Sequence, residues 1–150
     1  MLKVNDQAPD FKLPSTSGKL FSLGKDGKNK PCILYFYPKD FTPGCTKEAC
    51  EFRDSFSQFR DLNIDVYGIS RDSIETHLKF KEKHRLPFDL LSDFDGSVTK
   101  QYGALIPVLK IPRRVTYLLN ADHTIKAVYE DMFGASKHIK TMVKEVTTIE

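Results

Sequence analysis

Two cysteines five positions apart are the residues of this sequence best suited to chemistry. Cys45 directly follows Pro43 and Gly44, and Cys50 lies in the stretch behind it. The Pro-Gly turn places Cys45 in the first turn of a predicted helix, where unpaired N–H groups and the helix dipole stabilise an anion. Since the thiolate is the nucleophilic form of cysteine, this position favours a reactive sulfur. A small buried cysteine behind an ordinary turn is the alternative that position alone leaves open.

The spacing between Cys45 and Cys50 favours a redox switch over a permanent bridge. In an ideal helix, residues five apart have Cα atoms about 8.6 Å apart, whereas a disulfide needs less than about 7 Å. The two sulfurs can therefore bond only if the first turn or two of the helix unwinds. We predict that Cys45 is oxidised to a sulfenic acid, which Cys50 then resolves as a disulfide.

Other residues with metal or redox chemistry give weaker signals. The C-x4-C spacing differs from the usual zinc spacings, so a metal site is the weaker interpretation of the two cysteines. The four histidines are scattered, at His77, His84, His123 and His138. Cys32 lies in an apolar run without a cationic neighbour, which predicts an inert core thiol. Residues 79–85, with His77 and His84 on the same predicted helix, are expected to form a solvated face.

The elements that would position the cysteines alternate between strands and helices. Residues 32–37 form a continuous apolar run typical of a strand buried on both faces, and apolar residues recur at helical spacing over 46–61. A strand over 64–70 and a helix over 74–84 follow, then short apolar runs at 90–91 and 98–102. Strands over 115–119 and 125–129 predict a hairpin, and a last helix is expected over 136–146. Ahead of these lies an extended arm, with an exposed turn over 24–30.

This order predicts an α/β fold with a central mixed sheet flanked by helices, as one domain over residues 1–150. The chain has 150 residues, 40% hydrophobic and 29% charged, which is typical of a folded globular protein. A net charge of +3 without any block of like charge does not indicate nucleic acid or membrane binding. The first residues lack an apolar leader segment, so we expect a cytoplasmic protein.

The segment PKDFTPGCTKEAC, residues 38–50, resembles the P-x-x-x-T-x-x-C active-site motif of peroxiredoxins. The second cysteine is similar to that of the bacterioferritin comigratory protein or peroxiredoxin Q branch. The likeness extends to the segments APDFKLPSTSG, CILYFYP, LLSDFDGSVTKQYGA and RVTYLLN. It implies a thioredoxin-like fold with an N-terminal extension, and a thiol-dependent peroxidase that reduces hydrogen peroxide or organic hydroperoxides without metal, haem or flavin.

The same resemblance assigns roles around the peroxidatic Cys45. Thr42 would hydrogen-bond the thiolate and the peroxide, and Pro38 would shield the sulfur. Arg114 matches the active-site arginine of the family, which would stabilise the thiolate and the charge on the departing oxygen. Arg113 is the rival for this role, but its offset from the following strand does not fit.

Further expectations concern the partners of Cys45 and Cys50. Glu48 matches an acidic position that orients the arginine in relatives. Thioredoxin or a glutaredoxin-like protein is the expected reductant of the disulfide. Because the resolving cysteine lies in the same chain, we expect a monomer.

Two other functions are alternatives to the peroxidase. One is a thiol–disulfide oxidoreductase, but the sequence has no C-x-x-C motif, which counts against it. The other is a non-enzymatic redox sensor or chaperone.

Overall fold

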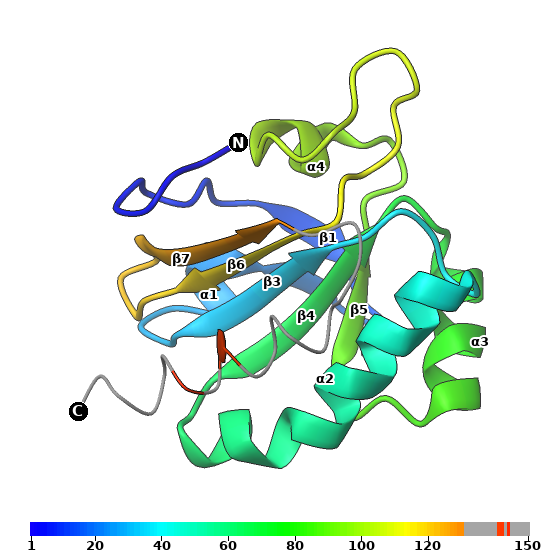
Figure 1. Ribbon diagram of the computed structural model, residues 1–150, viewed down its shortest axis with the longest axis horizontal. Helices are drawn as coiled ribbons and strands as arrows, with labels where there is room; N and C mark the ends of the chain where they lie inside the picture. The colour runs from blue at the N-terminus through cyan, green and yellow to red at the C-terminus, as the bar shows by residue number, and fades with distance from the viewer. Residues whose placement is uncertain (131–140, 143, 145–150) are drawn as a thin grey trace.

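A five-stranded mixed sheet forms the centre of the protein, in the order β5-β4-β3-β6-β7 (Figure 1). The structure, a computed structural model, describes residues 1–130, 141, 142 and 144. Strands β3, β4 and β5 are parallel, and β6 is antiparallel to both β3 and β7. The predicted mixed sheet and its final hairpin are therefore confirmed. The strands are β3 (Cys32–Phe36), β4 (Asp65–Ser70), β5 (Asp89–Ser92), β6 (Val115–Leu119) and β7 (Ile125–Glu130).

The central strand β3 is buried on both faces because helices or loops cover each side of the sheet. Ile33 and Tyr35 join an apolar cluster with residues of α2 (Pro43–Asp61) and α3 (Ile74–His84). Leu34 and Phe36 join the opposite cluster, with the N-terminal arm and α4 (Ser97–Gln101). Successive side chains of a strand point to opposite faces, so the continuous apolar run reflects two layers of packing.

The helices on either side of β4 begin where their capping residues dictate. Helix α3 has the predicted bounds, and the hydroxyl of its N-cap residue Ser73 accepts a hydrogen bond from the Thr76 N–H. Helix α2 begins at Pro43, three residues before the predicted start. Thr42 is extended at the N-cap, and proline suits the first helical position because its N–H would be unpaired there in any case.

The N-terminal arm and the region after β5 differ from expectation. Strands β1 (Lys12–Pro14) and β2 (Leu20–Ser22) pair as a small antiparallel sheet, followed by the short helix α1 (Leu23–Asp26) where an exposed turn was expected. The run 98–102 lies largely within α4, whose first N–H groups reach the Asp93 carboxylate from Val98 and Thr99. The helix expected over 136–146 falls largely outside the described residues. Within the described parts, no helix is long and apolar enough to cross a membrane.

Candidate active site

Cys45 lies at the start of α2, directly after the loop that follows β3. It is the third residue of the helix, and its side chain is buried, with only 1% of the residue exposed. Pro43 has no N–H, and the N–H groups of Gly44 and Cys45 have no acceptor within the helix. The sulfur therefore lies at the end of a helix where a negative charge is favoured.

Arg114 reaches the Cys45 sulfur from a distant part of the chain. It precedes β6, and the pairing of Val115 with Phe36 places it beside the end of β3. Its Nη2 donates to Cys45 Sγ at 3.4 Å, and its Nη1 donates to Glu48 Oε1 at 2.9 Å. Burial alone would lower the Arg114 pKa, but the charges of Glu48 and Cys45 outweigh this and raise it. The guanidinium thus stays charged beside the sulfur.

The glycine before Cys45 gives the guanidinium room to approach. A Cβ at Gly44 would lie 3.0 Å from Arg114 Nη2, closer than side chains normally pack. The Pro-Gly pair therefore has two effects, since proline starts the helix and glycine lets the cation approach its first turn.

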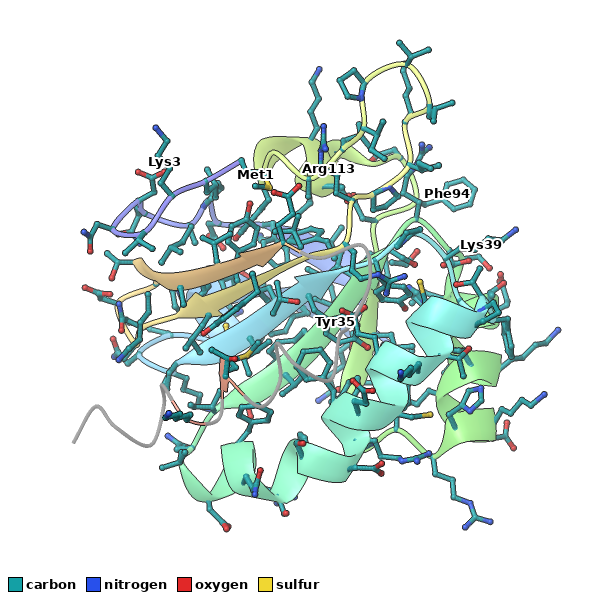
Figure 2. The ribbon with its side chains drawn as sticks, viewed as in Figure 1. Met1, Lys3, Tyr35, Lys39, Phe94 and Arg113 are labelled. Atoms are coloured by element: carbon teal, nitrogen blue, oxygen red, sulfur yellow. The ribbon has the colours of Figure 1, made fainter. Side chains whose placement is uncertain are left out.

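The other residues predicted for the site lie nearby with different contacts. Thr42 is the N-cap of α2, and its hydroxyl donates to the Lys39 carbonyl at 2.8 Å. Pro38 is half-buried in the same loop. Arg113 lies on the α4 side of the molecule (Figure 2), and its N–H donates to the Ala104 carbonyl. Of the two arginines, only Arg114 contacts Cys45 among the described residues.

The three cysteines are free thiols in distinct environments. Cys50 is half-buried, and its Sγ lies 3.9 Å from Nδ1 of His84. Since α2 is continuous through both Cys45 and Cys50, the structure represents the reduced form. Cys32 is buried, and burial, followed by the charge of Asp65, raises its pKa to about 12. This environment agrees with the inert core thiol that the sequence predicts.

A buried hydrogen-bond network beneath the loop was not foreseen. His77 was expected on a solvated face, but it is fully buried, and its Nδ1 lies 2.5 Å from Asp40 Oδ2. The Tyr37 hydroxyl donates to Asp40 Oδ1, and the Asp40 N–H donates to the Asp72 carboxylate. His77 Nε2 lies 3.0 Å from the Leu91 carbonyl, to which it can only donate.

This network corrects the interpretation of α3 as a helix with an outward-facing histidine. With Nε2 donating to a carbonyl, Nδ1 and the Asp40 carboxylate must share a proton between them. The pair ties the loop before α2 to α3 and β5. Asp40, Asp72 and His77 lie close enough together to hold a metal ion, but each already has hydrogen-bond partners in the network.

Tyr35 lies under α2, between the helix and the sheet (Figure 2). Its ring stacks on Phe52 and Tyr37, with centroids 4.6 and 5.3 Å away. Within the described part of the chain its buried hydroxyl has no hydrogen-bond partner. Burial, and then the charge of Glu48, raise the Tyr35 pKa well above its usual value. The Tyr35 hydroxyl is therefore a neutral group near the Glu48 carboxylate.

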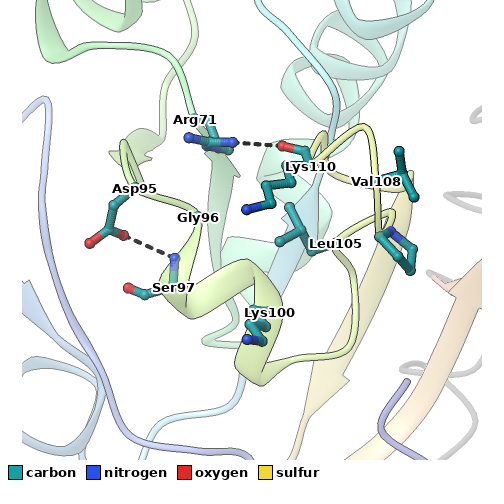
Figure 3. Close-up of a pocket in the computed structure, with 9 residues that line it drawn as sticks. Arg71, Asp95, Gly96, Ser97, Lys100, Leu105, Val108 and Lys110 are labelled. Atoms are coloured by element: carbon teal, nitrogen blue, oxygen red, sulfur yellow. Dashed lines mark hydrogen bonds between the residues drawn. The ribbon is translucent and has the colours of Figure 1, made fainter.

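A separate hollow of about 780 Å³ opens beside α4 (Figure 3). Arg71 crosses it and donates to the Lys110 carbonyl at 2.6 Å. Neither Cys45 nor Cys50 lines this hollow, so we assign it no part in the thiol chemistry. Its lining residues are Arg71, Asp95, Gly96, Ser97, Lys100, Leu105, Pro107, Val108 and Lys110.

Comparison with known proteins gives the family. Residues 4–128 match the AhpC/TSA family. The chain is 46% identical over 134 residues to the putative peroxiredoxin bcp of Coxiella burnetii, covering 85% of this chain and 88% of that protein. It is 42% identical over 143 residues to the chloroplastic peroxiredoxin Q of Sedum lineare, covering 95% of this chain and 76% of that protein.

Solved structures agree with these relatives. The crystal structure of the peroxidoxin BcpB of Mycobacterium tuberculosis superimposes with a TM-score of 0.93 at 33% identity, covering 100% of this chain and 99% of that one. The bacterioferritin comigratory protein of Xanthomonas campestris superimposes with a TM-score of 0.83 at 24% identity, covering 92% and 90%, and shares the fold. The chain therefore belongs to the AhpC/TSA family, as a thioredoxin-like peroxiredoxin of the bacterioferritin comigratory protein and peroxiredoxin Q group, and is a thiol-dependent peroxidase.

Proposed function

We propose that Cys45 is the residue that attacks the hydroperoxide and that Cys50 is the residue that resolves the oxidised sulfur. The observation that carries the first assignment is the contact between Arg114 Nη2 and the buried Cys45 Sγ at 3.4 Å. A guanidinium beside a sulfur at a helix N-terminus stabilises the thiolate through charge and hydrogen bonding together. Cys32, in contrast, has only apolar packing and a nearby carboxylate.

In the first step the Cys45 thiolate attacks the terminal oxygen of the hydroperoxide. A sulfur–oxygen bond forms as the oxygen–oxygen bond breaks, giving a sulfenic acid and an alkoxide or hydroxide that takes up a proton. Arg114 would stabilise the charge that develops on the departing oxygen. To donate to the thiolate or the peroxide, the Thr42 hydroxyl would have to turn away from the Lys39 carbonyl. Pro38 would shield the sulfur, and Glu48 would orient the arginine.

In the second step Cys50 attacks the sulfenic sulfur, and water leaves as the disulfide forms. This step requires α2 to unwind at its start, because two residues five apart in a helix are about 8.6 Å apart at Cα. A dithiol protein such as thioredoxin or a glutaredoxin-like protein then reduces the disulfide. Three cysteines in a chain of this length do not form a secreted disulfide framework, which supports a reducing compartment such as the cytoplasm. With both cysteines in one chain, a monomer can complete the cycle.

The substrate class in this proposal includes organic hydroperoxides as well as hydrogen peroxide. It is supported by the Xanthomonas campestris relative, which is described in terms of alkyl peroxide reduction. Steady-state assays with thioredoxin and its reductase, comparing hydrogen peroxide with a bulky organic hydroperoxide, measure the preference directly.

Two cysteine variants test the assignment. Cys45→Ser is expected to consume no peroxide and to lose no thiol on exposure to it. Cys50→Ser is expected to react once, to leave a sulfenic acid that dimedone traps at Cys45, and to fail to turn over with thioredoxin. Cys32→Ser is the matched control and should turn over normally. Normal turnover by Cys50→Ser would show that another group reduces the sulfenic acid.

A further inference from the structure

The Cys50 sulfur has one ionisable side chain within hydrogen-bond distance among the described residues. Nδ1 of His84, the last residue of α3, lies 3.9 Å from Cys50 Sγ. Both residues are half-buried where α3 ends against α2. Sulfur hydrogen bonds are longer than those of oxygen, so this separation allows a proton to pass between the thiol and the imidazole.

His84 is also fixed to α2 through its backbone. Arg53 Nη1 donates to the His84 carbonyl at 2.8 Å, which satisfies a carbonyl that would otherwise be unpaired at the end of α3. Arg53 lies one turn beyond Cys50 on α2. The ring of His84 packs edge-on against Phe80, with centroids 5.0 Å apart, and lies 6.5 Å from the ring of Phe41. The imidazole is thereby held in place beside the thiol.

The charged groups around His84 leave it able to accept a proton. Burial lowers its pKa from the usual value, and the nearby cations Lys83 and Arg53 lower it further. On α2 it faces Cys50 and Arg53, on α3 it neighbours Lys83 and Phe80, and from the loop Phe41 approaches. No carboxylate is among these contacts in the described part of the chain. The lowered pKa favours the neutral ring, which is the form that can accept a proton.

We propose that His84 is the general base that activates Cys50 in the resolving step. This rests on the proposed role of Cys50 as the resolving cysteine. The Cys50 thiol passes its proton to Nδ1, and the thiolate attacks the sulfenic sulfur of Cys45. The sulfur–sulfur bond forms as the sulfur–oxygen bond breaks, and the departing hydroxide takes the proton from the imidazolium and leaves as water, which returns His84 to its neutral form.

The geometry also indicates where unwinding of α2 would stop. The bond from Arg53 to His84 holds the helix from the turn after Cys50 onwards, whereas the turns that carry Cys45 have no such tie to α3 among the contacts described. Cys45 would therefore move towards Cys50, and His84 faces Cys50 at the edge of the part of α2 that stays tied to α3.

The test separates the two chemical steps in one experiment. Reduced protein is mixed with one equivalent of hydrogen peroxide and quenched at increasing times, and sulfenic acid and disulfide are measured by mass spectrometry after trapping. In His84→Gln, oxidation of Cys45 should keep the wild-type rate. Disulfide formation should slow by about 100-fold, the lower end of what general bases contribute.

The pH profile distinguishes a proton acceptor from a packing residue. In the wild type, the rate of disulfide formation should fall as the pH drops through the titration of His84, on the acid side of the usual histidine pKa. In His84→Gln this inflection should disappear, and in His84→Ala added imidazole should restore part of the rate. Lys83→Gln, on the same turn and exposed, is the matched control: it keeps the imidazole and should therefore keep the inflection, moved to higher pH because a cation that lowers the His84 pKa is gone.

The outcomes for His84 and Cys50 can be told apart. If Cys50→Ser fails to turn over but His84→Gln forms the disulfide at the wild-type rate with an unchanged pH profile, this proposal is wrong and the role of Cys50 stands. If Cys50→Ser turns over normally, the resolving role itself is wrong. His84→Phe, which keeps a ring against Phe80, replaces His84→Gln if the latter does not fold, and the same slow disulfide formation is expected.

Discussion

The Cys45 sulfur accepts a hydrogen bond from the guanidinium of a residue 69 positions away in the sequence. Replacing Arg114 by alanine removes the positive charge and the hydrogen-bond donor, and leaves Glu48 near the sulfur without this cation. We expect Arg114→Ala to slow the reaction of Cys45 with peroxide by about 10²-fold, as for other groups that stabilise developing charge. Stopped-flow measurement of the first step, independent of resolution, gives the rate.

Lysine at position 114 is the informative control for this prediction. It keeps the charge but cannot bridge Cys45 and Glu48 with two arms of one planar group. Arg114→Lys should therefore fall between the wild type and Arg114→Ala. A wild-type rate in Arg114→Ala would mean that the helix end alone activates the sulfur.

Cys32 gives a prediction with a defined pH dependence. Its pKa is raised to about 12, so at pH 8 only roughly one thiol in 10⁴ is ionised. We expect iodoacetamide at pH 8 to leave Cys32 unlabelled in the folded protein and to label it in urea, as read by mass spectrometry of the peptides. Since ionisation requires a pH near 12, raising the pH to 9 should not change this. Rapid labelling of Cys32 in the folded state would contradict its burial.

At the scale of elements, the pair of Asp40 and His77 joins the loop before α2 to α3. Removing one partner leaves the other buried with an unmet charge or hydrogen bond, which typically costs about 3–5 kcal/mol. We expect Asp40→Ala and His77→Leu each to lower the free energy of unfolding by an amount of this order. Urea unfolding of both single variants provides the measurement.

The double variant Asp40→Ala/His77→Leu tests whether the two side chains act as a pair. In the double variant neither side chain of the pair is left facing a missing partner, although the Tyr37 hydroxyl and the Leu91 carbonyl each lose a hydrogen bond, so the loss of stability should be smaller than the sum of the single changes. Purely additive losses would show that the two residues contribute independently. The cycle therefore separates coupling from the cost of removing each side chain.

The helix α2 is expected to respond to oxidation in two parts. Residues 43–50 must leave helical geometry for Cys45 and Cys50 to bond, whereas residues 53–61 stay joined to α3 through Arg53. Hydrogen exchange of the disulfide form should therefore show faster exchange over 43–50 and unchanged protection over 53–61. The Cys50→Ser variant treated with peroxide is the control and should keep the whole helix protected.

At the scale of the whole molecule, the sequence predicts the central architecture well. The bounds of α3 and β6 agree with the prediction, and β3, β4 and β7 differ from it by one residue each. These elements have strong local signals, such as apolar continuity or a capping serine. The resemblance to the family selects Arg114 over Arg113 through its offset from the following strand, and Arg114 is the arginine that contacts Cys45.

What the sequence does not predict depends on contacts between distant residues. His77 looks like any polar residue on an amphipathic helix, and its partner Asp40 lies 37 positions earlier. The contact of His84 with Cys50 likewise spans 34 positions and arises from how α3 ends against α2. The register of the short helix α4 depends on the Asp93 carboxylate, which precedes it in a separate turn. Such features become visible only once the sheet order is known.

The pairing of β3 with β6 has a consequence for how the enzyme acquires its reactivity. Phe36 pairs with Val115, and this pairing brings Arg114 to Cys45. A growing chain that has not yet reached β6 therefore contains the cysteine without its cation. Such long-range pairing also forms late, because chain entropy opposes it. During synthesis, peroxide would thus meet a Cys45 thiol that Arg114 does not yet activate. The rate of Cys45 oxidation would then report whether β6 has paired with β3.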